Sequence, residues 1–113
     1  MIVRLSFAAL LGVSMTIAYH STAQGRDGKT VYEASCRRCH GVIGTPPKTM
    51  KAKFPKIATF DAAFVTSHSE DSIVKILVKG KGEDMKSFKD SLSTEEMTAV
   101  AKYVRELGQK AHP

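Results

Sequence analysis

The chain has 113 residues, of which 42% are hydrophobic and 25% charged, and its formal net charge is +6. This length and balance suit one soluble globular domain and exclude a multidomain enzyme, a repeat array and a polytopic membrane protein. Two cysteines are too few for the disulfide framework that stabilises many small secreted domains.

The first 23 residues are typical of a secretory signal peptide. Arg4 is the only charged residue among them, and an apolar run follows it over 5–18. Ser21 and Ala23 are small residues of the kind that a signal peptidase accepts at its cleavage site. An uncleaved anchor is the alternative, but a spanning helix needs about 20 apolar residues. We therefore expect cleavage after Ala23, export to the periplasm and a mature domain of residues 24–113.

A helix is predicted at the start of this domain, followed by a long loop. Asp27 suits the N-cap of a helix that reaches to about Cys39, with Tyr32 on its inner face. The segment 41–56 contains three prolines and two glycines, so we expect it to be irregular. The segment 61–65 can form one short helical turn.

A second helix is predicted between Ser69 and Gly80. Ser69 suits its N-cap, Glu70 and Asp71 place negative charge in its first turn, and Gly80 ends it. The β-branched residues within 74–78 leave a strand as the alternative. A second loop is expected over 80–92.

The last predicted helix begins with a capping box, Ser93 at the N-cap and Glu96 three positions later. Apolar residues at spacings of three and four form one stripe along it: Met97, Val100, Ala101, Val104 and Leu107. Gly108 is expected to end the helix. Because no alternating strand pattern occurs, the predicted fold class is all-α, with three or four helices and two long loops. Loops of this length need something to order them.

One motif carries clear chemistry: Cys36-Arg37-Arg38-Cys39-His40 has the C-x-x-C-H pattern of c-type haem attachment. Two thiols three positions apart can each add to one vinyl group of the same porphyrin. The adjacent imidazole can then reach the iron. We predict one covalent haem c on Cys36 and Cys39, with His40 as an axial ligand.

Three other uses of the cysteines fit the sequence less well. A thioredoxin-like site needs a βαβ context, and no strand is predicted before this motif. A zinc site needs four ligands, and beyond the motif only His68, His112 or a carboxylate can complete it. A disulfide between Cys36 and Cys39 would close a very short loop and stabilise little.

The second axial ligand of the iron has several candidates. Met97 belongs to the apolar stripe of the last helix, whereas Met50 and Met85 lie in the two loops. Two glycines let the backbone near Met85 lie against a flat cofactor, so Met85 is the expected ligand and Met50 the alternative. A methionine ligand suits electron transfer, because it raises the potential of a His-ligated haem. His68 is expected to be a solvated loop residue.

The other ring nitrogen of His40 needs a hydrogen-bond acceptor, which fixes the tautomer and the orientation of the ring. The backbone carbonyls of Pro46 and Pro47 are the expected candidates, and that of Pro55 is a further one.

These features together resemble the small monohaem class I cytochromes c over residues 28–107. Three segments carry the resemblance: CRRCHG at 36–41, GKGEDMKSF around Met85, and LSTEEMTAVAKYVREL in the final helix. The chain departs from the family pattern at Lys86, where many relatives have proline. The stretch 45–64 matches nothing in that pattern.

The resemblance implies a cytochrome c-like fold in which the first and last helices cross. In the family, the crossing uses a glycine and an aromatic residue on one helix and an aliphatic and an aromatic residue on the other. Gly28 and Tyr32 match the first pair, and Val100 and Tyr103 match the second.

The expected function is that of a soluble one-electron carrier between larger redox proteins, and not that of an enzyme. An iron held on both faces has no open position for substrate, although the haem edge can still exchange an electron. Two alternatives remain open: a cytochrome subunit of a periplasmic dehydrogenase or oxidase complex, and a five-coordinate haem sensor or peroxidase. Lys86 motivates the last of these, because proline would stiffen the loop beside Met85.

Basic residues in the two loops bear on partners, which we expect to be redox proteins with acidic docking surfaces. The lysines concerned are Lys48, Lys51, Lys53, Lys56, Lys75, Lys79, Lys81, Lys86 and Lys89. They would steer such a partner in a salt-dependent way, or serve only as a solvated face. We expect a monomer with no nucleic-acid partner and no membrane anchor after signal cleavage.

Overall fold

The computed structural model describes residues 12, 16, 17 and 25–110. Within these residues the chain forms six helices and no strand, and its one extended pairing is an isolated bridge between Lys81 and Met85. The predicted all-α fold class is confirmed. The expected signal peptide lies outside the described residues except at positions 12, 16 and 17, and His112 lies outside them as well. No helix in the described part of the chain is long and apolar enough to span a bilayer.

Two helices, α1 (Gly28–Ser35) and α2 (Arg37–His40), replace the single helix predicted before the first loop. Asp27 caps α1 as predicted, and its carboxylate accepts a hydrogen bond from the backbone N–H of Thr30 at 2.9 Å. The helix is interrupted at Cys36, where φ is −123° and ψ is −39°. The break puts the first cysteine of the motif between two helices and the second cysteine on α2.

The first loop contains a helix that the sequence analysis did not predict. α3 (Lys48–Lys53) begins directly after Pro47 and ends at Phe54. The expectation of an irregular segment over 41–56 was therefore wrong for its central part. Proline restricts the residue before it to extended backbone, but Pro47 is the N-cap of this helix, and its carbonyl accepts from the N–H groups of Met50 and Lys51, each at 3.0 Å.

The helix α4 (Ala62–Ser67) forms where a short helical turn was expected, and α5 (Glu70–Lys79) follows its predicted cap, Ser69. The Asp61 carboxylate accepts from the backbone N–H of Phe64 at 2.9 Å, and the Ser69 hydroxyl accepts from that of Ser72 at 3.2 Å. Gly80 ends α5 with a φ of +74°, and a Cβ there would lie 2.7 Å from the carbonyl oxygen of Met85. The segment 74–78 is thus helical and not a strand.

The last helix, α6 (Thr94–Lys110), begins with the predicted capping box. The Ser93 N–H donates to the Glu96 carboxylate at 3.3 Å, and the Glu96 N–H donates to the Ser93 hydroxyl at 3.1 Å. The helix continues beyond Gly108, so its predicted end was wrong. A Cβ at Gly108 would lie 2.5 Å from a methyl carbon of Val65. This glycine therefore allows α4 to approach α6.

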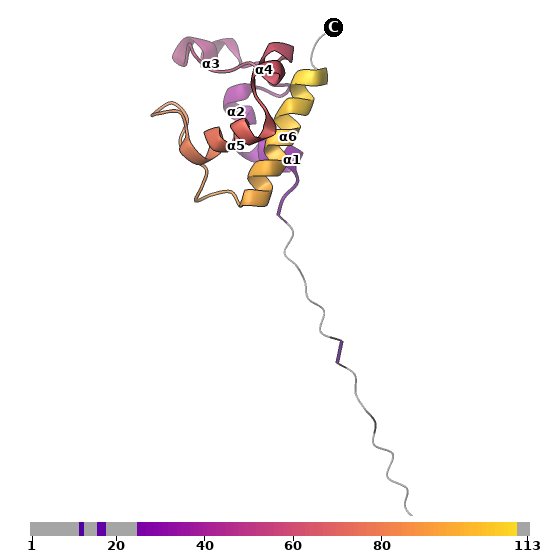
Figure 1. Cartoon of the computed structure of the whole chain (residues 1–113). Helices are drawn as coiled ribbons and strands as arrows, with labels where there is room; N and C mark the ends of the chain where they lie inside the picture. The colour runs from indigo at the N-terminus through magenta and orange to yellow at the C-terminus, as the bar shows by residue number, and fades with distance from the viewer. Residues whose placement is uncertain (1–11, 13–15, 18–24, 111–113) are drawn as a thin grey trace, which may run out of the picture.

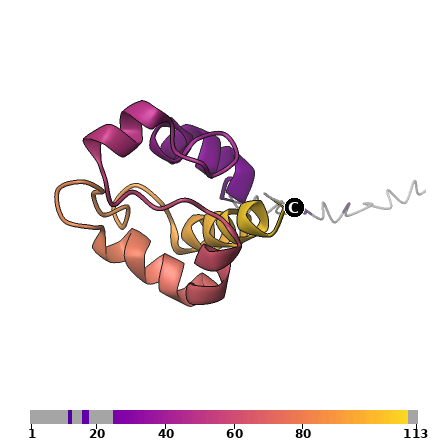
Figure 2. The ribbon, with the colours of Figure 1, turned by 90° about the horizontal axis from the view of Figure 1, so that it is seen from above.

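The crossing of α1 and α6 that the resemblance implied is confirmed. A Cβ at Gly28 would lie 2.2 Å from the carbonyl oxygen of Ala99, so the two backbones are in direct contact there. The rings of Tyr32 and Tyr103 pack beside this contact with their centroids 5.3 Å apart. Figure 1 shows α1 against the middle of α6, and Figure 2 shows α5 on the opposite side of α6 from α1 and α2.

The buried core joins α1, α5 and α6 with the segments between them. Its members are Val31, Tyr32, Cys36, Phe60, Ile73, Leu77, Leu92, Met97, Val100, Ala101 and Val104. Four of the five residues of the predicted stripe on α6 belong to it, and Leu107 packs against it as a partly buried residue.

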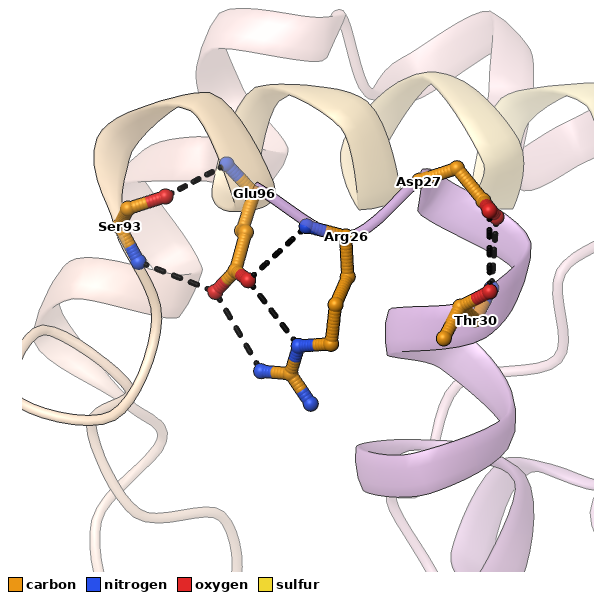
Figure 3. A network of polar contacts seen from close by, with 5 residues as sticks. All are labelled: Arg26, Asp27, Thr30, Ser93 and Glu96. Atoms are coloured by element: carbon orange, nitrogen blue, oxygen red, sulfur yellow. Dashed lines mark hydrogen bonds and ion pairs between the residues drawn. The ribbon is translucent and has the colours of Figure 1, made fainter. Parts of the chain in front are cut away.

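A polar network ties the chain ahead of α1 to the first turn of α6 (Figure 3). The Glu96 carboxylate accepts from the Arg26 side chain at 3.0 Å and 3.3 Å, and from the Arg26 backbone N–H at 3.2 Å. These bonds, together with the one from the Ser93 N–H, lower the pKa of Glu96 to about 2. Since α1 follows immediately, the network also fixes where α1 begins relative to α6.

Candidate cofactor site

A mostly apolar cavity of about 630 Å³ lies between α2, α5, α6 and the segments that connect them. Pockets for cofactors commonly have volumes of about 300–1,000 Å³. All four residues predicted to bind the haem line this cavity: Cys36, Cys39, His40 and Met85. The fold therefore brings together the C-x-x-C-H motif and a methionine more than forty positions away in the sequence.

The two cysteines are free thiols, and both line the cavity. Cys36 is buried at the break between α1 and α2, and Cys39 is half-buried on α2. Burial raises the pKa of Cys36 to about 11, and the neighbouring Cys39 adds to the shift. The Cys36 thiol is therefore protonated at neutral pH.

His40 is the last residue of α2, and one of its ring nitrogens is fixed by the backbone. Nδ1 lies 3.2 Å from the carbonyl oxygen of Ala58. A carbonyl can only accept, so Nδ1 carries the proton and Nε2 keeps its lone pair for a metal. Burial lowers the pKa of His40, and the bond to Ala58 partly opposes that shift. The expectation that a proline carbonyl fills this role was wrong.

Met85 occupies a tight turn between α5 and α6. The Lys81 N–H donates to the Met85 carbonyl at 2.7 Å, and positive φ angles at Gly80 and Gly82 allow the turn. Met50 lies on α3 and Met97 in the core of α6, and neither belongs to the cavity lining. Among the methionines that the structure describes, Met85 alone faces this space.

A continuous row of aromatic rings forms another part of the lining. His40 stacks on Phe60 at 4.6 Å, Phe60 packs on Phe64 at 4.9 Å, and Phe64 stacks on His68 at 4.1 Å. His68 is thus a half-buried member of the cavity wall and not the solvated residue that we expected. The spacing of four between Phe60, Phe64 and His68 is the sequence signal that was overlooked.

The alternatives to haem find little support in this geometry. Cys36 and Cys39 do not form a disulfide. In the described part of the chain, no group of three or more His, Cys, Asp or Glu side chains could hold a metal ion by itself. The residues present do fit a porphyrin: the cavity is mostly apolar and of suitable size, and two free thiols, an imidazole whose pKa is lowered by burial and a thioether line it.

Comparison with known proteins places the chain in a family. The family model described as "Cytochrome C oxidase, cbb3-type, subunit III" matches residues 23–104. A solved structure described as the KustC0563 c-type cytochrome is 31% identical with a TM-score of 0.65, over 73% of this chain and 98% of that one. Cytochrome c6C from Synechococcus sp. PCC 7002 is 28% identical with a TM-score of 0.58, over 73% of this chain and 94% of that one. Among curated proteins, none matches.

The crossed helices and the cavity lined by the C-x-x-C-H motif define the class as small class I c-type cytochromes. The chain belongs to the cbb3-type cytochrome C oxidase subunit III family, as the match over most of its length shows. It carries covalently bound haem c, and its activity is haem-based electron transfer.

Proposed function

We propose that this protein is an exported, mobile one-electron carrier. Its single haem is attached through Cys36 and Cys39, and its iron is held by His40 and Met85. The observation that carries the proposal is the meeting of these four side chains in one cavity. When bound, the haem supplies an Fe(III)/Fe(II) couple. The protein around it sets the reduction potential of this couple and the access of other molecules to the haem.

The attachment step uses the two thiols alone. The sulfur and the hydrogen of each thiol add across one vinyl double bond, so a C–S bond forms, no atom leaves and no external oxidant is needed. The break at Cys36 supports this role, because it places the first cysteine outside α2 while both cysteines line the cavity.

The two proposed axial ligands differ in how they are held. Ala58 fixes the ring of His40 through Nδ1, and Phe60 supports its face, which leaves Nε2 for the iron. Met85 lies in the turn that follows Gly80, where its carbonyl accepts from the Lys81 N–H, and it packs against the core as a partly buried residue. If His40 and Met85 both held the iron, no position would remain for a substrate, and the haem would exchange electrons only.

Exposed lysines at the cavity support an acidic redox partner. Lys56, Lys81 and Lys86 contribute to the lining and are exposed, while Asp84 is the one acidic residue among the lining residues. Positive charge beside a redox cofactor accelerates transient docking of a negative partner and loses its effect as salt rises. The proposed cleavage after Ala23 would deliver the domain to the periplasm, where such partners meet it.

A second candidate is a cytochrome subunit fixed in an oxidase complex, and the description of the matching family favours it. A third is a five-coordinate sensor or peroxidase, which Lys86 beside Met85 favours, because proline would have stiffened the turn.

Two measurements on the native haem protein separate these functions. Carbon monoxide should bind the reduced protein slowly and weakly, because Met85 must leave the iron first; rapid, tight binding would support the five-coordinate alternative. Gel filtration of the native protein should give a monomer, whereas a stable large assembly would support the fixed subunit.

A further inference from the structure

A second groove, of about 440 Å³, lies on the surface beside α2, and we call it the α2 groove. Arg37 and Arg38 contribute to its lining, whereas Cys39 and His40 of the same helix line the cofactor cavity described above. No residue that the structure describes lines both spaces. The remaining lining residues of the groove are Glu33, Gly41, Val42, Thr45 and Pro47. The groove therefore has no part in the proposed haem ligation.

Two neighbouring aliphatic residues are exposed on the loop that borders this groove. Val42 is 62% exposed and Ile43 is 54% exposed, which are the largest values for big hydrophobic residues within 25–110. Single exposed apolar residues are common on protein surfaces. Two adjacent ones leave a continuous apolar area in water, and covering that area with another molecule is favourable. The pair therefore indicates a contact site.

The loop that carries this pair is fixed to the core at both ends. The Tyr32 hydroxyl donates to the Gly41 carbonyl at 2.7 Å, and the Phe60 N–H donates to the Gly44 carbonyl at 2.8 Å. Both glycines are buried, and a Cβ at Gly44 would lie 2.8 Å from the Phe60 Cβ. The exposed pair is thus held in place before any partner arrives, which lowers the entropy that binding costs.

The positive charge of the domain is concentrated in the segment that borders the groove. The segment 37–60 contains no acidic residue, whereas the rest of residues 24–113 has nearly equal numbers of basic and acidic ones. Its cations are all exposed: Arg37, Arg38, Lys48, Lys51, Lys53 and Lys56. Figure 2 shows α3, which carries three of these lysines, on the same side of the molecule as α1 and α2. This side complements a partner with negative charge.

Two kinds of partner carry such charge, an acidic protein and an anionic membrane. The concave shape of the groove and the carboxylate of Glu33 within it favour the protein, because a bilayer surface does not fill a groove and an anionic one repels a carboxylate. Helices that bind at a bilayer surface usually present Trp, Phe or Leu to it. The exposed residues of 37–60 include none of these types.

We propose that the α2 groove, with Val42 and Ile43 beside it, is a second docking face that binds an acidic protein surface with an apolar side chain at its centre. This inference rests on the proposed carrier function, because it concerns the partners of that carrier. The lysines at the cofactor cavity stay available to a different protein, since the two sites share no lining residue. The carrier can then remain bound to one protein while its haem exchanges an electron with another.

Site-specific photo-crosslinking in cells that export the haem protein tests this proposal. A photo-reactive amino acid replaces Ile43, and mass spectrometry identifies the molecule and the segment that it contacts. We expect a crosslink to one other protein, at a segment rich in Asp and Glu. Arg37→Gln together with Arg38→Gln should lower the crosslink yield about tenfold, as loss of charged contacts at the centre of an interface does.

Lys81→Gln together with Lys86→Gln is the matched control, because it removes two positive charges at the cofactor cavity and should leave the yield unchanged. The proposal is overturned if position 43 crosslinks to lipid, to a second copy of this chain, to a protein segment without acidic residues or to nothing. It is also overturned if the arginine substitutions lower the yield no more than the control does. Each of these results leaves the proposed function intact as long as the protein carries covalent haem. A protein without covalent haem would instead contradict the proposed function itself.

Discussion

The four proposed haem-binding side chains reach the cavity from three kinds of backbone. Cys39 and His40 lie on the short helix α2, Cys36 lies in a helix break, and Met85 lies in a turn flanked by two glycines with positive φ. A helix constrains the directions of its side chains more tightly than a turn does. Substitutions in the Met85 turn should therefore affect the potential before they affect haem attachment.

Replacement of Met85 by alanine tests the second axial ligand. We expect Met85→Ala to abolish the weak long-wavelength absorption of ferric haem bound by a thioether sulfur and to lower the reduction potential. Met50→Ala is the matched control, since Met50 lies on α3 outside the cavity lining. An absorption band that survives Met85→Ala and disappears in Met50→Ala would assign the ligand to the other loop.

From the sequence, the chemistry of single residues was easier to predict than the residues that contact them in the folded protein. The C-x-x-C-H motif lies within five positions, so the sequence alone was enough to predict its thiols and imidazole as haem-binding groups. The acceptor for His40 is a backbone carbonyl, at Ala58, and any residue type supplies one. His68 was expected to be a solvated loop residue, because its place in the cavity wall depends on a stack with Phe64 that forms only after folding.

At the scale of elements, the contact of α1 with α6 depends on the absence of a side chain at Gly28. Its hypothetical Cβ would lie 2.2 Å from the Ala99 carbonyl oxygen and 2.9 Å from the Tyr103 Cβ. Both neighbours are parts of a helix that cannot yield locally. Any side chain at this position must push the two helices apart.

We expect Gly28→Ala to destabilise the haem protein by about 1–3 kcal/mol, as overpacking of a close contact usually does. Denaturant unfolding measures this change. Lys29→Ala is the control at the adjacent, exposed position of α1, and it should change stability by less than about 0.5 kcal/mol. Equal effects of the two substitutions would contradict the close contact.

The polar network of Arg26, Ser93 and Glu96 predicts a dependence of stability on pH. The pKa of Glu96 is lowered to about 2 in the folded protein by its bonds to Arg26 and Ser93. A lowered pKa means that the carboxylate stabilises the fold above the ordinary glutamate pKa, and that this contribution is lost as the pH falls toward 2.

The variant Glu96→Gln isolates this contribution, since glutamine does not ionise. The wild type should melt a few degrees above Glu96→Gln at pH 6–7, and the difference should shrink steadily below about pH 4.5. Thermal unfolding followed by circular dichroism measures it. A difference that stays constant from pH 7 to pH 2 would show that the ionised carboxylate contributes nothing.

Local signals predicted where helices begin more reliably than where they end. Asp27, Ser69 and Ser93 act through side chains that bond to their own first turns, so the signal is complete in the sequence. Gly108 was taken as a stop, but α6 continues through it, because the missing side chain makes room for Val65 of α4. The sequence alone does not distinguish a glycine that ends a helix from a glycine that allows another helix to pack closely.

At the scale of the whole molecule, three exposed lysines, Lys56, Lys81 and Lys86, lie at the cavity. The chain has 17 basic and 11 acidic residues, and exposed lysines contribute to the cavity lining. The all-α class was predicted from the sequence pattern, and the helix crossing was implied by the resemblance to class I cytochromes c. The cavity was not, because its lining comes from segments between residues 35 and 104 that only the fold assembles.

Electron exchange with an acidic redox protein should therefore fall several-fold as ionic strength rises from about 0.01 M to 0.15 M, over which the Debye length shrinks from about 30 Å to 8 Å. Replacing Lys81 and Lys86 by glutamine should slow the exchange at low salt and weaken its salt dependence. Stopped-flow kinetics measures both effects. Lys102→Gln, at an exposed position of α6 outside the cavity lining, is the control and should leave them unchanged. An electron-exchange rate that does not change with salt would contradict a role of these lysines in docking.

The central claim is that Cys36 and Cys39 bind one haem covalently, and the intact mass of the exported protein after denaturation tests it most directly. The chain should be produced in a host that attaches haem to C-x-x-C-H motifs. We predict the mass of the mature polypeptide plus one haem, and loss of that added mass when both cysteines are replaced by alanine. A colourless protein with the mass of the polypeptide alone would contradict the account.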